Sequence, residues 1–350
     1  MSTVSDARAP LRPTPANDPF PPATKAAPPA GSRTLLIKAK GGLGNRMLAA
    51  VTGVILAQLS GRTPVIDWRD GLYVPEGTNL YPLLFRDPIG IDPAHFDDST
   101  AVAPSLWTGR LTEQPVTIIA RHFPDKHSSP FIYRRLSVPL TAADPAAPVG
   151  VFWSYLPKLA RLRGRLRADR RFDGRSLDAI TQDMLHRFFT PNDRVRQAVS
   201  HLFAGRRRPM IGVHIRFTDR KVPLAKIERA LIRLRAHSPA SDIFLATDSA
   251  EAQRYITSRF KRVFTIDKQL VEDGRALHYA GTQMSDPLRE AENAVIDMFA
   301  LAGCDWLIHS RHSTFSVAAS LIGGISPKRQ IDVDRFNAKV IVKRWFQSFA

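Results

Sequence analysis

Short apolar runs alternate with helix-like segments from Met210 to Val333, a pattern that few folds accommodate. Strands are predicted at 210–216, 242–247, 262–266, 305–309 and 330–333, with helices at 225–236, 250–260, 287–302 and 313–322. Because a helix then lies between successive strands, the strands can pair in parallel with helices on both faces of one sheet. This part of the chain is predicted to be a doubly wound α/β domain.

A second pattern of the same kind begins at Thr34. A strand is predicted at 34–39, a glycine loop at 41–44, a helix at 43–59 that stops at Gly61, and a strand at 64–68. The 350 residues are enough for two cores. We therefore predict two parallel-sheet α/β domains, at 34–204 and 205–350, with a cleft between them.

Two stretches depart from this alternation. Residues 1–33 contain eight prolines and almost no large apolar side chains, which predicts a disordered tail. The region from about 75 to 200 is predicted to be irregular, and within it the stretch 158–175 is strongly basic. Two interpretations of that stretch stay open: a solvated surface segment, or a contact with an acceptor or a membrane surface.

The composition narrows the class of protein. The chain has one cysteine, Cys304, no apolar run long enough to span a bilayer and no secretory signal pattern, so we expect a cytoplasmic protein. The formal net charge of +18 favours anionic partners. A surface that is simply rich in arginine explains this charge equally well. Nucleic acid is not the expected partner, because 158–175 has only Phe172 among its arginines.

Ligands of parallel α/β sheets bind beyond the carboxyl ends of the strands. Four predicted strand ends carry polar side chains or glycines, namely 40–46, 214–221, 247–249 and 309–316. In the second, His214 and Arg216 alternate on one face of an apolar strand, and a guanidinium can bind a phosphate through two hydrogen bonds. In the fourth, hydroxyls precede a helix whose first N–H groups favour anions. These strand ends predict a site for a diphosphate.

The same turns resemble those of a known family. The chain resembles the fucosyltransferase superfamily, and within it most closely the rhizobial nodulation fucosyltransferases that modify chitin oligosaccharides. The strongest likeness is the stretch Gly61-Arg62-Thr63-Pro64-Val65-Ile66-Asp67-Trp68-Arg69, followed by Tyr73 and Thr78-Asn79. Three further motifs follow the family pattern: G-G-x-G-N at Gly41–Asn45, H-x-R-x-x-D at His214–Asp219, and S-T-F-S at Ser313–Ser316.

This resemblance implies a GT-B fold and inverting transfer of fucose from GDP-fucose to a glycan, with neither a metal nor another cofactor. It also implies roles for particular residues. Arg216 is expected to stabilise the departing GDP and Asp219 to act as a catalytic carboxylate. The expected donor-binding residues are Gly42, Gly44, Asn45, Arg46, His214, Asp248, Ser313, Thr314, Phe315 and Ser316.

Some positions depart from the family pattern. Phe217 stands where relatives have a second arginine, Arg220 where they have a lysine, and Leu224 where some have a carboxylate. The general base therefore stays open. Two alternatives also stay open: a GT-B transferase that uses another nucleotide sugar, and a non-catalytic homologue that binds GDP.

The residues around the acidic side chains of the C-terminal half predict which of these side chains are buried. Glu290 and Glu292 are expected to be solvated, whereas Asp297 lies among apolar residues and is expected to be buried with a cationic partner such as Arg216 or His214. The sequence Asp332-Val333-Asp334 resembles a metal-binding D-x-D, but we interpret it as coincidence and predict no metal site.

Overall fold

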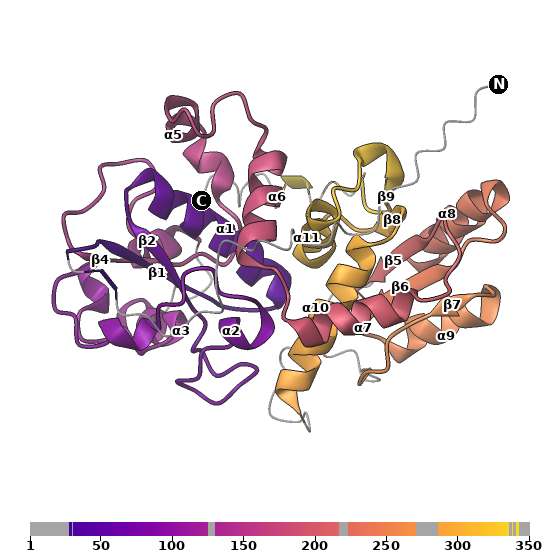
Figure 1. Ribbon diagram of the computed structural model, residues 1–350, viewed down its shortest axis with the longest axis horizontal. Helices are drawn as coiled ribbons and strands as arrows, with labels where there is room; N and C mark the ends of the chain where they lie inside the picture. The colour runs from indigo at the N-terminus through magenta and orange to yellow at the C-terminus, as the bar shows by residue number, and fades with distance from the viewer. Residues whose placement is uncertain are drawn as a thin grey trace. The chain divides into compact units, whose positions relative to one another are not determined.

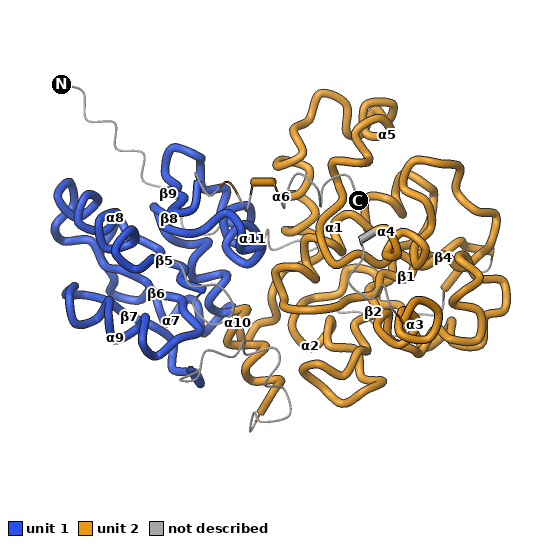
Figure 2. Tube along the Cα trace, turned by 180° about the vertical axis from the view of Figure 1, so that it is seen from behind, with its two compact units in different colours: residues 1–21, 196–277, 296–335 blue, residues 22–195, 278–295, 336–350 orange. Residues whose placement is uncertain are grey.

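The computed structural model describes residues 28–29, 31–124, 130–216, 223–270, 286–335, 338 and 341–342. Most of the predicted tail lies outside these residues. The chain divides into two compact units, coloured separately in Figure 2. The C-terminal unit comprises 196–277 and 296–335, together with the undescribed 1–21, and the N-terminal unit comprises 22–195, 278–295 and 336–350. The domain boundary predicted at residue 204 stays a prediction.

The N-terminal unit is built on a four-stranded parallel sheet in the order β2-β1-β4-β3 (Figure 1). Its strands are β1 (Thr34–Lys38), β2 (Thr63–Asp67), β3 (Val102–Ala103) and β4 (Val149–Phe152). Helix α1 (Leu43–Leu59) crosses from β1 to β2, as predicted. It ends at Ser60 and is followed by Gly61, which adopts the left-handed φ of 61° that favours glycine.

The region predicted to be irregular contains more regular structure than expected. It contains β3, β4 and the 12-residue helix α6 (Leu177–Phe188), whose cap Ser176 accepts a hydrogen bond from the N–H of Ala179. The shorter helices are α2 (Tyr81–Leu84), η1 (Pro93–Phe96), η2 (Ser105–Trp107), α3 (Pro115–His122), α4 (Pro130–Tyr133), η4 (Arg134–Leu136), η5 (Leu159–Leu162) and α5 (Arg163–Ala168). The prediction missed β4 because it is only four residues long and pairs with β1, more than 100 residues earlier.

The basic stretch 158–175 is only partly a solvated segment. Its apolar residues Leu159, Leu162 and Leu166 are buried in the N-terminal unit. Arg165 donates hydrogen bonds to the carbonyls of Leu59 and Leu140, so it helps to close the end of α1. The leucines that a membrane surface would require are therefore already used in packing.

The C-terminal unit has a five-stranded parallel sheet in the order β7-β6-β5-β8-β9. The strands are β5 (Ile211–Ile215), β6 (Ile243–Thr247), β7 (Val263–Phe264), β8 (Trp306–His309) and β9 (Gln330–Asp332). The helices are α8 (Leu224–His237), α9 (Ala250–Arg259), α11 (Thr314–Ile322) and η7 (Pro327–Arg329), together with the last part of α10 (Pro287–Ala302), whose residues up to Val295 belong to the N-terminal unit. Helix α7 (Asp193–Phe203) precedes them. All five strands and the four long helices predicted here are present, and the α/β class with two parallel sheets is confirmed.

Two acidic side chains of α10 differ in their surroundings. Glu292 is 5% exposed and forms ion pairs with Arg194 at 3.3 Å and Arg289 at 3.5 Å, so the expectation that it is solvated was wrong. Asp297 is 2% exposed, which confirms the predicted burial, and it pairs with Lys268, a partner that the prediction did not name. Within the described part of the chain, no helix is both long and apolar enough to cross a bilayer.

Candidate functional site

Each sheet has one point where successive connections run to opposite sides, and ligands of doubly wound sheets bind at such a point. In the C-terminal unit it lies between β5 and β8, because β5 connects to β6 on one side and β8 to β9 on the other. The turns after these two strands begin at Arg216 and Ser310. The fold thus brings together two of the four stretches singled out in the sequence.

His214 lies at the end of β5 and is only 8% exposed. Its ring stacks on Phe315 of α11, with centroids 5.1 Å apart and an interplanar angle of 21°. Burial, together with the charges of Arg216, His309 and Lys268, lowers the pKa of His214 to about 3. The imidazole is therefore neutral at physiological pH, and it joins the strand end to the helix as a packed, uncharged ring.

Arg216 is the last described residue after β5 and is half-buried. Its charge helps to lower the pKa of His214, the ring that stacks on Phe315 of α11. A further cation, Lys268, follows β7 and pairs with the buried Asp297 of α10. Asp219, the expected catalytic carboxylate, lies outside the described residues.

The turn from His309 to Ser316 is held by hydrogen bonds among its own residues. The ring nitrogen Nδ1 of His309 lies 3.1 Å from Oγ of Ser316, which also donates to the carbonyl of Ser310 at 3.1 Å. Oγ of Ser310 in turn donates to Asp334 at 2.7 Å. His309 and Ser316 are both fully buried, so this turn presents a defined backbone to any ligand.

The D-x-D sequence has a structural role that the sequence alone did not reveal. Asp332 accepts hydrogen bonds from the backbone N–H groups of Arg311 at 3.2 Å and Asp334 at 3.0 Å. Asp334 is 7% exposed and accepts from Ser310. The two carboxylates therefore brace the turn between β8 and α11.

Helix α11 begins directly at this turn. Ser313 is its N-cap and makes no side-chain capping hydrogen bond, and the first turn of the helix consists of Thr314, Phe315 and Ser316. Such a helix start favours a bound anion. At the end of β6, Asp248 is half-buried, and the helix that follows is capped by Ser249 instead. Ser249, and not Asp248, is therefore the N-cap of α9.

In the N-terminal unit, the glycine loop after β1 positions a buried arginine. Gly42 is the N-cap of α1, Gly44 lies in its first turn, and the N–H of Asn45 donates to the carbonyl of Gly42 at 3.0 Å. Arg46 is 1% exposed and donates to the carbonyl of Gly41 at 2.6 Å.

The guanidinium of Arg46 also forms a two-point ion pair with Asp70, at 3.1 and 2.6 Å. It lies 5.6 Å from the ring centroid of Trp68 and 5.5 Å from that of Tyr73. Arg46 thus ties the loop after β1 to the loop after β2. Its direct contact with a donor stays a prediction.

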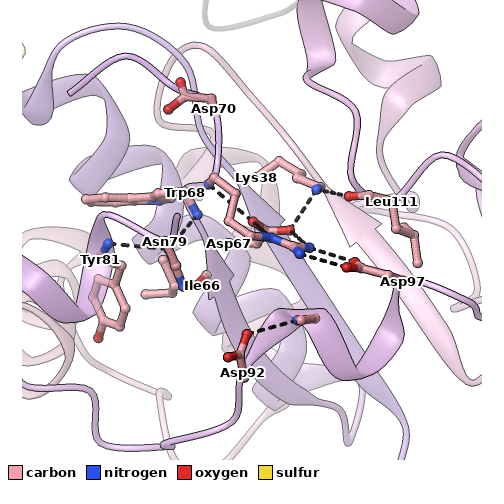
Figure 3. Close-up of polar contacts among 12 residues, drawn as sticks. Lys38, Ile66, Asp67, Trp68, Asp70, Asn79, Tyr81, Asp92, Asp97 and Leu111 are labelled. Atoms are coloured by element: carbon pink, nitrogen blue, oxygen red, sulfur yellow. Dashed lines mark hydrogen bonds and ion pairs between the residues drawn. The ribbon is translucent and has the colours of Figure 1, made fainter. Parts of the chain in front are cut away.

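A network of charged side chains lies at the end of β2, around Asp67 (Figure 3). Asp67, at the end of β2, accepts from Nζ of Lys38 at 2.7 Å and from Nε and Nη2 of Arg69 at 2.9 and 3.0 Å. Arg69 continues to Asp97 through two hydrogen bonds of 2.9 and 2.8 Å, and Lys38 also reaches the carbonyl of Leu111. The surrounding cations lower the pKa of Asp67 in spite of its complete burial.

The stretch 61–79, on which the resemblance noted in the sequence chiefly rests, mainly holds β2 and its loop in place. Arg62 is 4% exposed and donates to Asp144 and to the backbone carbonyls of Thr34, Pro145, Ala147 and Pro148. Asn79 bridges the carbonyl of Ile66 and the N–H of Trp68. These side chains set the path of β2 and its loop. In the described residues, no group of three or more His, Cys, Asp or Glu side chains is arranged to hold a metal ion.

Comparison with known proteins agrees with this fold. Residues 176–344 match the family model of nodulation protein Z (NodZ), just under half of the chain. No curated protein matches the chain by sequence.

Among solved structures, NodZ α-1,6-fucosyltransferase soaked with GDP-fucose is similar, with a TM-score of 0.61 and 22% identity over 83% of this chain and 92% of that one. Fucosyltransferase NodZ from Bradyrhizobium gives 0.60 and 21% over the same shares. A mutant of Arabidopsis thaliana FUT1 in complex with GDP gives 0.50 and 13%, over 84% of this chain and 69% of that one.

Identities at this level establish the fold. The GT-B fold expected from the resemblance is confirmed: the chain has the fold of these solved fucosyltransferase structures over most of its length, and residues 176–344 are similar to the NodZ family model.

Proposed function

We propose that this protein transfers fucose from GDP-fucose to a glycan hydroxyl, with inversion at the anomeric carbon and without a metal ion. The observation that supports this most strongly is the switch point of the C-terminal unit. There Arg216, the neutral His214 stacked on Phe315, and the uncapped start of α11 surround one strand end. The similar NodZ structures were solved with GDP-fucose and with GDP.

In this proposal the diphosphate lies between Arg216 and the first turn of α11. The guanidinium donates two hydrogen bonds to phosphate oxygens, and the backbone N–H groups of Thr314 to Ser316 donate to others. As the bond from the anomeric carbon to the phosphate oxygen breaks, negative charge grows on GDP. Both groups then bind the departing GDP more strongly than the intact donor, which lowers the barrier.

The remaining parts keep this arrangement rigid. The ring of His214 stays uncharged because of its low pKa, so it adds no competing positive charge beside the strand end. The hydrogen bonds that Asp332 and Asp334 accept from Arg311 and Ser310 hold the backbone that α11 extends. Asp248, at the end of β6, is proposed to accept hydrogen bonds from the nucleoside, because the second half of a doubly wound site binds there.

On the opposite face of the sugar, an acceptor hydroxyl attacks the anomeric carbon as GDP leaves. The hydroxyl proton passes to a base, and Asp219 is the proposed base. A single displacement of this kind inverts the configuration. Stabilisation of the leaving group would carry most of the rate enhancement if the base is weak.

Incubation of the purified protein with radiolabelled GDP-fucose and a panel of glycans tests this proposal. Transfer of label to a glycan is expected, with the inverted anomeric configuration by NMR and undiminished rate in EDTA. Equal or faster transfer from GDP-mannose or a UDP-sugar would reject fucose as the donor. Retained configuration would reject the single displacement, and GDP binding without any transfer would indicate a non-catalytic homologue.

A further inference from the structure

Helix α8, which packs on the sheet of the C-terminal unit (Figure 1), has two different sides. Its residues Ile227, Ala230 and Leu231 are buried in the core of that unit. The opposite side of the helix is exposed and carries Ala225, Lys226, Arg229, Ile232, Arg233, Ala236 and His237. With 3.6 residues per turn, these positions form one continuous face of the helix. We call these residues the outer face of α8.

The outer face carries only basic and small or apolar side chains, because the one acidic residue of α8 points elsewhere. This residue, Glu228, turns to helix α9, where its carboxylate accepts a hydrogen bond from the hydroxyl of Tyr255 and pairs with Arg259 at 3.5 Å. Its charge is therefore used in holding α8 to α9. The outer face keeps a positive charge that no residue of its own helix offsets.

The two arginines of the outer face lie next to one another. Arg229 and Arg233 are four residues apart, and like charges at this spacing destabilise a helix. In the part of the chain that the structure describes, neither guanidinium pairs with a carboxylate, and Arg229 donates to the carbonyl of Ala225 at 3.3 Å. Arg208 and Arg262 of the same unit, by contrast, do form ion pairs. An anion bound from outside would relieve the repulsion on the outer face.

The basic surface continues past the end of α8. Arg235 donates hydrogen bonds to the carbonyls of Pro239, at 3.1 Å, and of Lys261, which joins the end of α8 to the loop between α9 and β7. Lys261 and Arg262 in that loop are exposed. This loop lies at the edge where the parallel strands begin, whereas the switch point between β5 and β8 lies where they end. The basic surface therefore extends away from the switch point.

We propose that the outer face of α8, with the adjoining Lys261 and Arg262, binds an anionic phospholipid surface. The cations attract the lipid headgroups, and Ile232, which is 55% exposed between Arg229 and Arg233, enters the headgroup region. A nucleic acid fits less well, because the outer face has no Phe, Tyr or Trp on which a base could stack. This contact goes beyond the proposed function and does not depend on it.

Co-sedimentation of the whole chain with phosphatidylglycerol vesicles, compared with phosphatidylcholine vesicles, tests this contact. The double variant Arg229→Gln, Arg233→Gln removes two charges from the outer face, and Ile232→Ser removes its apolar side chain without changing the charge. The double variant Arg167→Gln, Arg170→Gln is the matched control, because it removes the same charge at exposed positions of the N-terminal unit. All of these side chains are exposed, and thermal unfolding checks that each variant is folded.

We expect tighter binding to phosphatidylglycerol than to phosphatidylcholine, and weaker binding as the salt concentration rises. Loss of each arginine should weaken the binding about fivefold, and Ile232→Ser should weaken it about three- to fivefold. Equal binding to the two kinds of vesicle overturns the proposal, as does an equal loss in the control or unchanged binding of Ile232→Ser. So does binding of duplex DNA or RNA, in place of vesicles, that depends on Arg229 and Arg233.

Vesicle binding and transfer are measured separately, so this inference and the proposed function can fail independently. GDP binding, and transfer of fucose to a glycan in the absence of vesicles, are expected to be the same in wild type and in all of these variants, since none of the substituted residues lies at the switch point. Vesicle binding without any transfer would reject the proposed function alone. Transfer without vesicle binding would reject this inference alone.

Discussion

The substitution Asp67→Asn tests how far the N-terminal sheet depends on its buried charges. The carboxylate of Asp67 accepts three hydrogen bonds of 2.7 to 3.0 Å from Lys38 and Arg69, and it has no exposed side-chain surface. An amide keeps the shape but turns two of its own hydrogens toward these cations. Lys38 then loses the only carboxylate with which the structure pairs it among the described residues, whereas Arg69 keeps Asp97.

Removing one partner of a buried ion pair costs about 3 to 5 kcal/mol. Because Arg69 retains a carboxylate, we expect the free energy of unfolding to fall by the low end of this range, about 3 kcal/mol. This corresponds to a fall in Tm of roughly 6 to 12 °C. Urea denaturation followed by tryptophan fluorescence measures this, since Trp68, Trp107 and Trp153 are buried in the same unit. Asp193→Asn is the control, because Asp193 pairs with Arg86 at an exposed position and should cost less than about 1 kcal/mol.

The pH dependence has a defined sign. The pKa of Asp67 is lower in the folded state than in the unfolded chain, so its contribution is complete at neutral pH and is lost as the pH falls below about 4. The difference between wild type and Asp67→Asn should shrink in that range. If Asp67→Asn lowers the free energy of unfolding by less than about 1 kcal/mol at pH 7, the argument that the ion pairs stabilise this strand end is refuted. A difference in stability between wild type and Asp67→Asn that grows as the pH falls would refute it as well.

Two further predictions concern other positions. Gly41→Ala should lower the free energy of unfolding by about 1 to 2 kcal/mol in urea, because of its positive φ and the 2.9 Å contact with Tyr155; an unchanged value would contradict this. The variant His214→Phe keeps the ring stack on Phe315. Because the pKa of His214 is about 3 in the folded state, the folded wild type binds fewer protons below about pH 6.5 than its unfolded chain does. The free energy of unfolding of wild type should therefore fall relative to that of the variant as the pH drops below about 6.5. Parallel pH–stability curves would reject this.

Elements with a clear period and clear ends were predictable from the sequence. Helix α1 was predicted at its observed bounds, because its apolar positions recur at helical spacing between a glycine loop and Gly61. Helices α10 and α11 follow the same logic. The strand β4 was not predictable, because four apolar residues among prolines carry no period and its partner β1 is distant in sequence.

The candidate site was likewise predictable only in part. The ends of β5 and β8 could be recognised as one site, because parallel strands place their carboxyl ends at one edge of the sheet. The partner of each side chain was not predictable. Asp297 pairs with Lys268, which follows a different strand, and Arg62 pairs with Asp144 from a separate segment. Such pairings depend on how the loops pack, which no local spacing encodes.

Titration of GDP into the wild type and into Arg216→Gln tests most directly whether the switch point between β5 and β8 holds the nucleotide. We expect GDP to bind to the wild type. In Arg216→Gln a charge-assisted contact to the diphosphate is removed, so the binding free energy of GDP should weaken by about 2 to 3 kcal/mol, which is a roughly 30- to 150-fold rise in Kd. Arg233→Gln, an exposed arginine on α8, should bind as wild type does. Equal affinities in wild type and Arg216→Gln, or no GDP binding at all, would contradict the account.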